Sequence, residues 1–146
     1  MTRLPTLQPT TYTEAIDALL RECGLVATDA SSGAGIAWIE AKQDDQTVGV
    51  VALQRAGSAA LLRALGVVPK RRHCGIGASL VAAAERAARH EGLESLYLLT
   101  EGAHAYFTAL GYQHAEREEV PAAIHRLPQF AGLCPASALC MTKRLR

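Results

Sequence analysis

A glycine-containing basic turn, set between an apolar run and a helical pattern, constrains this chain more than any other feature. Residues 67–79 read Val-Val-Pro-Lys-Arg-Arg-His-Cys-Gly-Ile-Gly-Ala-Ser, and they overlap the end of the apolar run 61–68. Apolar residues then recur at helical spacing over 78–90. A helix that begins at such a turn directs unpaired N–H groups and the positive end of its dipole into it. With the basic string Lys70–Arg72 beside it, the turn is predicted to bind a di- or polyphosphate.

Two common phosphate-binding motifs do not fit this turn. A Walker loop requires the string Gly, four residues, then Gly-Lys-Ser/Thr, which the sequence lacks. The dinucleotide fingerprint requires a third glycine where Leu80 stands, and its first glycine follows the strand directly, whereas six residues separate Val68 from Gly75. Glu101 stands near the end of the next apolar run, where that fingerprint has its acidic ribose contact, so dinucleotide binding remains a weaker alternative. A glycine-rich turn beside a solvated basic cluster is the other alternative.

A second motif gives the turn a context. The pattern Arg72-x-x-Gly75-x-Gly77 is followed by one helical and one strand-like segment, and then by Ala103-x-x-Tyr106-Phe107-x-x-x-Gly111-Tyr112. In this order and spacing, the two motifs resemble those of the GCN5-related N-acetyltransferase (GNAT) family, which binds acetyl-coenzyme A. The resemblance implies an α/β (α+β) fold with a mixed, mostly antiparallel central sheet, flanking helices and splayed central strands. The length predicts a single domain over residues 1–146.

The remaining patterns place the other elements. Glu14 to Leu20 is predicted to be a helix with Thr13 as its N-cap, and Gly92 to end the helix after the turn. Strands are predicted over 35–40, 47–53, 61–68, 95–100 and 138–145, a candidate strand within 112–118, a loop over 29–35, and an irregular helical segment over 121–130.

The resemblance also implies how the cofactor is held. In the family the central strand splays from its neighbour, and the pantetheine arm pairs with the exposed backbone. Here those backbone groups would belong to Leu65, Gly66, Val67 and Val68, with the N–H of Val67 or Val68 polarising the thioester carbonyl. The turn would contact the rest of the cofactor through Arg72, His73, Cys74, Gly75, Ile76, Gly77, Ala78 and Ser79.

The proton donor departs from the family pattern. Aligning Gly111 places Phe107 where many members have a general-acid tyrosine, and phenylalanine has no proton to give. Tyr106 is the catalytic candidate, although it lies about 100° further round the helix. The alternative for Tyr106 is a core aromatic residue with its hydroxyl at the rim. Solvent water can also protonate a leaving thiolate.

Arg63 is the candidate acceptor-binding residue. On a regularly alternating strand it shares a face with Leu61, Leu65 and Val67. Since burying an uncompensated charge is costly, an arginine among apolar neighbours requires a partner. That partner is either an anionic group of the acceptor or an internal carboxylate, such as that of Glu40 or Glu101. The same two glutamates are the candidate bases for removing the ammonium proton.

A closer resemblance covers nearly the whole chain. Three strings of this sequence are similar to those of a GNAT subgroup described as arsenic-resistance or amino-acid N-acetyltransferase-like. They are Leu61-Leu62-Arg63, Tyr97-Leu98-Leu99-Thr100 and Gln129-Phe130-Ala131-Gly132-Leu133-Cys134-Pro135-x-Ser137-Ala138-x-Cys140-Met141. The function expected is transfer of an acetyl group from acetyl-coenzyme A to a small-molecule amine, such as an amino acid or an arsenic-containing analogue. A protein N-acetyltransferase and a catalytically weak coenzyme A-binding sensor are the alternatives.

Composition argues against several other classes of function. The net charge of +1 gives no general attraction to nucleic acid or membranes, and no run of residues is apolar and long enough to span a bilayer. The four cysteines form no C-x-x-C pair and the histidines have no metal-ligand spacing, so no metal is predicted. Without an apolar leader segment, we expect a reduced cytoplasmic protein. Because homodimers are common in the family, a homodimer is also a possible oligomeric state of this chain.

Overall fold

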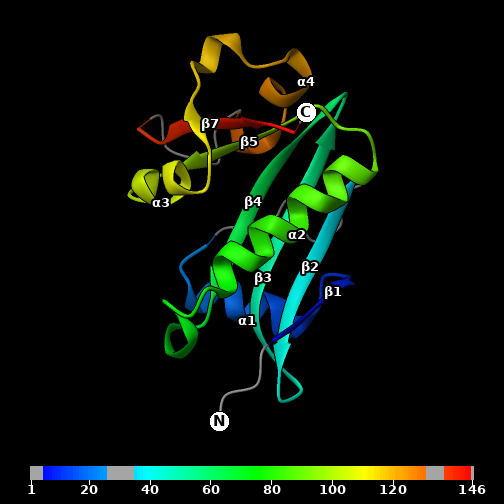
Figure 1. The fold of residues 1–146 in the computed structure, drawn as a ribbon, viewed down its shortest axis with the longest axis vertical. Coiled ribbons are helices and arrows are strands. Elements are labelled where there is room, and N and C mark those ends of the chain that lie inside the picture. Colours follow the sequence, from blue (N-terminus) through cyan, green and yellow to red (C-terminus); the bar gives the residue numbers. More distant parts are fainter. Residues whose placement is uncertain (1–4, 26–34, 131–136, 146) are drawn as a thin grey trace.

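One seven-stranded sheet organises the chain (Figure 1). The computed structural model describes residues 5–25, 35–130 and 137–145. The strand order is β1-β2-β3-β4-β5-β7-β6. The strands are β1 (Thr6–Thr10), β2 (Ile36–Gln43), β3 (Gln46–Ala56), β4 (Ala59–Val67), β5 (Ser95–Thr100), β6 (Gln113–His114) and β7 (Leu139–Arg144). The helices are α1 (Glu14–Glu22), α2 (Ile76–His90), α3 (His104–Ala109) and α4 (Ala122–His125), with short 3-10 turns η2 (Pro69–Arg71) and η3 (Arg117–Glu119).

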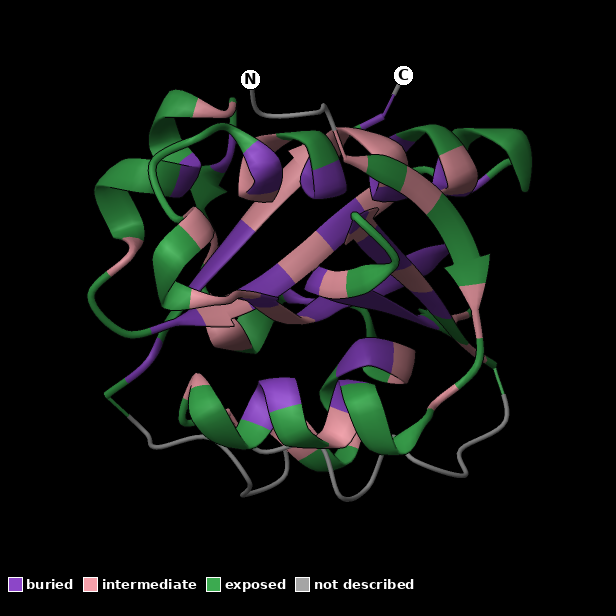
Figure 2. Cartoon of the chain, turned by 90° about the horizontal axis from the view of Figure 1, so that it is seen from below, coloured by how far each residue is buried: buried purple, intermediate pink, exposed green. Residues whose placement is uncertain are grey.

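Helices cover both faces of the sheet, and Figure 2 shows their buried sides turned toward it. The predicted apolar stripe of α2, with Leu80, Val81 and Ala84, is almost fully buried against the sheet. On the opposite face α1 buries Ile16, Leu19 and Leu20. Thr13 caps α1 as predicted, because its hydroxyl accepts a 3.3 Å hydrogen bond from the Ile16 N–H. The amphipathic patterns therefore correctly predicted α1 and α2 and the face that each helix buries.

β2 and β3 form an antiparallel hairpin, and together they cover more residues than the strands predicted over 35–40 and 47–53. Asp44 and Asp45 both have positive φ, at 53° and 63°, which suits a type I′ turn and its matching strand twist. The loop shrinks to these two residues, so Gln43 and Gln46 belong to the strands.

The central strands splay, as the family resemblance implies. β4 and β5 are parallel and pair only over Ala59–Leu61 with Ser95–Tyr97, whereas every other neighbouring pair of strands is antiparallel. Beyond Leu61, β5 stays paired with β7 and β4 stays paired with β3. Figure 1 shows β5 and β7 running at a wide angle to β2, β3 and β4. The mixed, mostly antiparallel sheet of the prediction is confirmed.

A β-bulge in β4 overturns one prediction about its faces. Val50 pairs with Gly66 but Ala52 pairs with Arg63, so β4 holds one extra residue, and Ala64 there has φ +55°. The bulge reverses which side chains face α2. Leu65 and Val67 pack on the α2 face, while Leu61 lies in the cluster of the other face. The expectation that Arg63 shares a face with Leu65 and Val67 is therefore wrong.

Two other segments differ from their patterns. The patterns predict no strand before Thr13, yet β1 pairs with β2 along the sheet edge, where Pro9 is tolerated because edge strands need fewer ladder donors. Within 112–118 the strand β6 is limited to Gln113 and His114, which pair with β7, and η3 begins at Arg117. The predicted loop over 29–35 lies outside the described residues except for Gly35.

A buried carboxylate ties α2 to the turn that follows α3. Glu85, which is 6% exposed, accepts hydrogen bonds from the Tyr112 hydroxyl and the Lys143 ammonium, both at 3.0 Å. Lys143 also donates to the Leu110 carbonyl at 2.9 Å. Burial, and then the Glu85 carboxylate, raise the pKa of Tyr112, so its contribution to stability is present below about pH 10 and is lost as pH rises further.

Replacing Lys143 with methionine is expected to lower the free energy of unfolding by about 3 kcal/mol, because it leaves the Glu85 carboxylate buried without its cation. The matched control is Arg55→Met, which removes an exposed 3.2 Å ion pair with Glu91 and is expected to cost under about 1 kcal/mol. Urea unfolding at neutral pH measures both. Equal losses in the two variants would show that burial of Glu85 does not set the cost.

Candidate functional site

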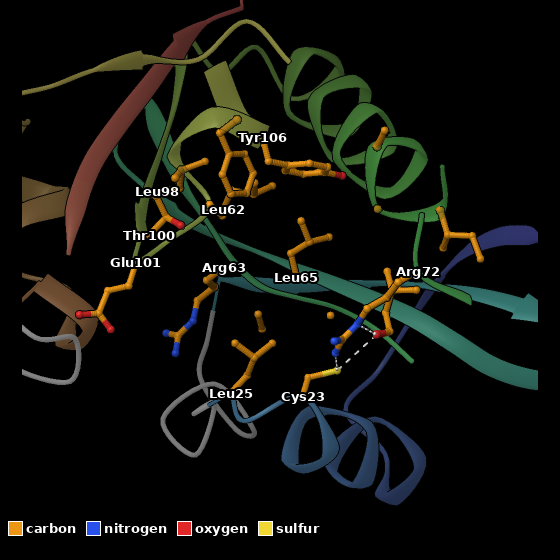
Figure 3. Close-up of a pocket in the computed structure, with 18 of the residues that line it drawn as sticks. Cys23, Leu25, Leu62, Arg63, Leu65, Arg72, Leu98, Thr100, Glu101 and Tyr106 are labelled. Carbon is orange, nitrogen blue, oxygen red and sulfur yellow. Dashed lines mark hydrogen bonds between the residues drawn. The ribbon is translucent and has the colours of Figure 1, made fainter. Parts of the chain in front are cut away.

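A cavity of about 780 Å³ opens where β4 and β5 diverge. Its walls come from the second half of β4, the end of β5, the start of α2, α3 and the end of α1, as Figure 3 shows. Most of the residues predicted from sequence line it, namely Arg63, Leu65, Gly66, Val67, Arg72, His73, Gly75, Ile76, Gly77, Ala78, Glu101 and Tyr106. Three predicted contacts, Val68, Cys74 and Ser79, do not line it.

The backbone of β4 presents alternate residues to the cavity. The Val68 N–H donates to the Val48 carbonyl at 2.9 Å, so Val68 is engaged with β3. Because hydrogen-bonding direction alternates along an antiparallel strand, Gly66 also faces β3, while Leu65 and Val67 face the opening toward β5. Of the two N–H groups that the sequence left open for the thioester carbonyl, only that of Val67 points into the opening.

The predicted phosphate turn leads directly into α2. His73 and Gly75 both have positive φ, at 64° and 83°, and α2 begins at Ile76, two residues earlier than predicted. Its first internal hydrogen bond runs from the Ser79 N–H to the Gly75 carbonyl at 3.0 Å. The N–H groups of 76–78 precede that bond and have no partner within the helix. Ile76, Gly77 and Ala78 line the cavity, whereas the Ser79 N–H is used by the helix.

Arg72 contacts the strand rather than the turn. Its Nε donates to the Val67 carbonyl at 2.9 Å, and its Nη2 lies 3.6 Å from the Cys23 sulfur. The Cys23 thiol lies 3.6 Å from the same carbonyl (Figure 3). Sequence patterns gave no signal for Cys23, since only the packing of α1 against β4 brings it to the cavity.

The Tyr106 side chain directs its hydroxyl toward the start of α2, whereas the Phe107 ring is buried in the core. A Cβ built on Gly77 would lie 2.7 Å from the Tyr106 hydroxyl oxygen, and Figure 3 shows the ring pointing toward α2. Burial raises the pKa of Tyr106, so the hydroxyl is protonated at neutral pH. Phe107 is 7% exposed and packs edge-on against Tyr112, with ring centroids 5.7 Å apart.

Arg63 is buried at the point where the strands part. It is 4% exposed, lines the cavity, and donates from Nη1 to the Gln54 Oε1 at 3.0 Å. In Figure 3 its guanidinium extends from β4 into the space between Glu101 and Leu25. Arg63 is therefore at the end of the cavity away from the phosphate turn, because that turn follows the other end of β4.

The two candidate bases are separated by the fold. Glu101 follows β5, lines the cavity and accepts a 2.8 Å hydrogen bond from the Ser137 hydroxyl. Glu40 does not line the cavity, and its contacts are on β1, β2 and the start of β3, with Gln8 at 2.9 Å and Thr47 at 3.4 Å. Only Glu101 can therefore meet a molecule bound in the cavity.

Neither metal ligands nor a membrane helix were found in the described ranges. Within them, no three His, Cys, Asp or Glu side chains are arranged to hold a metal ion, and no helix is long and apolar enough to cross a bilayer. Cys140 is buried, which raises the pKa of its thiol to about 11, whereas Cys74 is exposed. Cys134 lies outside the described residues.

Sequence and structure comparisons agree on the family. The profile described as "Acetyltransferase (GNAT) family" matches residues 4–112, and no curated protein matches the chain. A GNAT-family acetyltransferase of Staphylococcus aureus superposes with a TM-score of 0.77 at 15% identity, covering 97% of this chain and 100% of that one. N-acetylglutamate synthase of Neisseria gonorrhoeae, complexed with coenzyme A and N-acetyl-glutamate, gives 0.78 at 20% identity over 97% of this chain and 35% of the synthase.

A further similar structure is the ribosomal-protein-S18-alanine N-acetyltransferase of Escherichia coli, with a TM-score of 0.72 at 16% identity over 96% of this chain and 94% of that one. At these identities the superpositions establish the fold, and the profile match establishes the relationship. With its splayed sheet, its glycine turn and a matching profile over residues 4–112, the chain belongs to the GNAT family of acyl-coenzyme A-dependent N-acyltransferases, for which acetyl-coenzyme A is the co-substrate.

Proposed function

We propose that this chain acetylates the amine of a small molecule that also carries an anionic group, such as the carboxylate of an amino acid. The position of Arg63 supports this, since a buried guanidinium lines the cavity at its far end from the phosphate turn. A guanidinium binds a carboxylate through two parallel charge-assisted hydrogen bonds, which give both orientation and affinity. An arsonate also offers anionic acceptor oxygens, so the resemblance to the arsenic-resistance subgroup fits the same site.

The cofactor would lie along the opposite wall of the cavity. We place its pyrophosphate on the N–H groups of 76–78, beside the basic residues of the turn. The pantetheine arm would pair with the backbone of Leu65 and Val67, and in doing so would replace Arg72 at the Val67 carbonyl. Arg72 lies only four residues before Ile76, so its guanidinium, once released from the Val67 carbonyl, would be able to contact the pyrophosphate.

The acetyl transfer then requires three contributions. Glu101, directly or through a water molecule, takes the proton from the acceptor ammonium. The Val67 N–H polarises the thioester carbonyl and stabilises the oxyanion as the amine attacks. When the carbon–sulfur bond breaks, the Tyr106 hydroxyl donates a proton to the departing thiolate, and the second proton that the amine nitrogen loses returns Tyr106 to its neutral form through solvent. Holding the acceptor on Arg63 converts this into a reaction between two positioned partners.

Replacing Tyr106 with phenylalanine is expected to lower kcat by about tenfold to 100-fold, because water is a poorer proton donor to the thiolate. The coenzyme A dissociation constant should change less than about threefold, since the ring that fills the cavity wall is retained. Steady-state kinetics with a thiol-release readout measure kcat, and calorimetry measures the dissociation constant. An unchanged kcat would indicate that solvent water, and not Tyr106, protonates the departing thiolate.

A panel of paired acceptors tests the proposed function. Each amino acid is compared with its own α-carboxamide, which keeps the amine and side chain but loses the anion. We expect kcat/KM to favour the carboxylate by at least about tenfold. Equal rates for the pair would refute the proposal. Preference for a peptide N-terminus would indicate a protein N-acetyltransferase, and cofactor binding without turnover of any amine would indicate a coenzyme A-binding sensor.

A further inference from the structure

A buried glutamine stands directly behind the arginine of the acceptor site. Gln54 lies on β3, where it pairs with Leu61, while Arg63 pairs with Ala52. The two side chains are therefore diagonal neighbours on one face of the sheet. Gln54 is 8% exposed, and its Oε1 accepts the 3.0 Å hydrogen bond from Arg63 Nη1. Arg63 lines the cavity but Gln54 does not, so the amide can act on a bound molecule only through the guanidinium.

The choice of an amide at this position has an electrostatic consequence. A carboxamide oxygen accepts a hydrogen bond and fixes the plane of a guanidinium, but it carries no net charge. A carboxylate of the same size would form a charge-assisted pair with the same nitrogen and neutralise it in a low-dielectric setting. An apolar side chain would remove this constraint on the plane of the guanidinium. Glutamine therefore orients Arg63 and adds no negative charge beside it.

We propose that Gln54 is a positioning residue that sets the charge preference of the acceptor site. Its hydrogen bond holds the Arg63 guanidinium in the orientation that binds an anionic group of the acceptor, and Gln54 contributes no charge of its own. This inference rests on the proposed function, because it assumes that the acceptor anion binds Arg63. It identifies a specificity determinant behind the cavity wall, which acts on the acceptor through Arg63 alone.

Two variants of similar volume separate charge from orientation. Gln54→Glu places a carboxylate on Arg63, and its carboxylate-over-carboxamide preference in kcat/KM should fall about 100-fold, mainly through KM for the carboxylate acceptor. Gln54→Met removes the hydrogen bond alone, and it should lower kcat/KM by about threefold to tenfold while retaining a preference for the carboxylate. The acetyl-coenzyme A dissociation constant should stay within about twofold in both variants, since Gln54 is remote from the cofactor wall.

A second measurement tests the Gln54–Arg63 contact without any acceptor. If the carboxylate introduced by Gln54→Glu pairs with Arg63, its pKa falls, and the variant loses stability relative to wild type as pH drops from about 6 to about 3. With Arg63→Met added, the buried carboxyl loses that cation and its pKa rises. The pH dependence should then reverse, with stability gained as pH falls. Urea midpoints across this range report both cases.

The outcomes distinguish this inference from the proposed function. If wild type prefers carboxylate acceptors and Gln54→Glu keeps that preference, the inference is wrong and the proposed function stands. If wild type shows no preference, both are wrong, and the contact is structural only. If the pH dependence of Gln54→Glu is the same with and without Arg63, the contact does not operate in solution and the inference is overturned whatever the acceptor.

Discussion

Replacing Arg63 with methionine is expected to reduce kcat/KM for a carboxylate-bearing acceptor by about 100-fold to 1,000-fold, and for the matched carboxamide by less than about fivefold. The guanidinium is 4% exposed at the far end of the cavity, so a carboxylate bound there loses its water and depends on Arg63 for compensation. Methionine has a similar reach and no charge. Removing the guanidinium leaves the buried Gln54 Oε1 without its 3.0 Å donor, which is expected to cost about 1 to 3 kcal/mol, so a urea midpoint accompanies the kinetics to verify that the variant is folded.

Arg63→Lys provides the matched control for this prediction. Lysine keeps the positive charge but loses the planar fork, so it should recover part of the lost kcat/KM for the carboxylate acceptor. Calorimetry should show the same acetyl-coenzyme A affinity in both variants as in wild type. If methionine reduces turnover of carboxylate and carboxamide equally, Arg63 supports the fold of the cavity and does not recognise the acceptor anion.

Replacing Gly77 with leucine should weaken acetyl-coenzyme A binding by about 100-fold or more, because the new side chain fills the space that the cofactor would cross. A Cβ at this position already lies 2.7 Å from the Tyr106 hydroxyl oxygen and 3.9 Å from a Val67 methyl. Folding should survive, since Gly77 lies in α2 without a positive φ and leucine has the higher helix propensity by up to about 1 kcal/mol. Calorimetric titration and a urea midpoint measure the two effects.

The control for Gly77→Leu adds the same side chain elsewhere on the same helix. Arg86 is exposed on α2 and does not line the cavity, so Arg86→Leu should leave acetyl-coenzyme A affinity within about twofold. Adding Gly75→Val to Gly77→Leu should abolish binding, because Gly75 has φ +83° and a β-branched residue cannot adopt that conformation without strain. Unchanged affinity in a folded double variant would remove the glycine turn from the cofactor site.

Sequence alone determined the features that depend on neighbouring residues. The capping of α1 by Thr13, the buried stripe of α2 and the glycine turn at Gly75 and Gly77 follow from local hydrogen bonding, helical periodicity and backbone sterics. The splayed sheet came from the resemblance, which two motifs at the right spacing carried. Together these predicted that β4 and the turn before α2 hold the cofactor, and most of the residues predicted there line the cavity where β4 and β5 diverge.

Only the tertiary structure decided which groups face that cavity. The bulge at Ala64 depends on the register of β4 against β3, and it moved Leu65 and Val67 to the face opposite Arg63. The contact between Gln54 and Arg63 depends on the same register. The approach of Tyr106 to Gly77 depends on how α3 packs against α2. Each joins residues distant along the chain, and a one-residue change in register exchanges the two faces of a strand, so no local pattern encodes them.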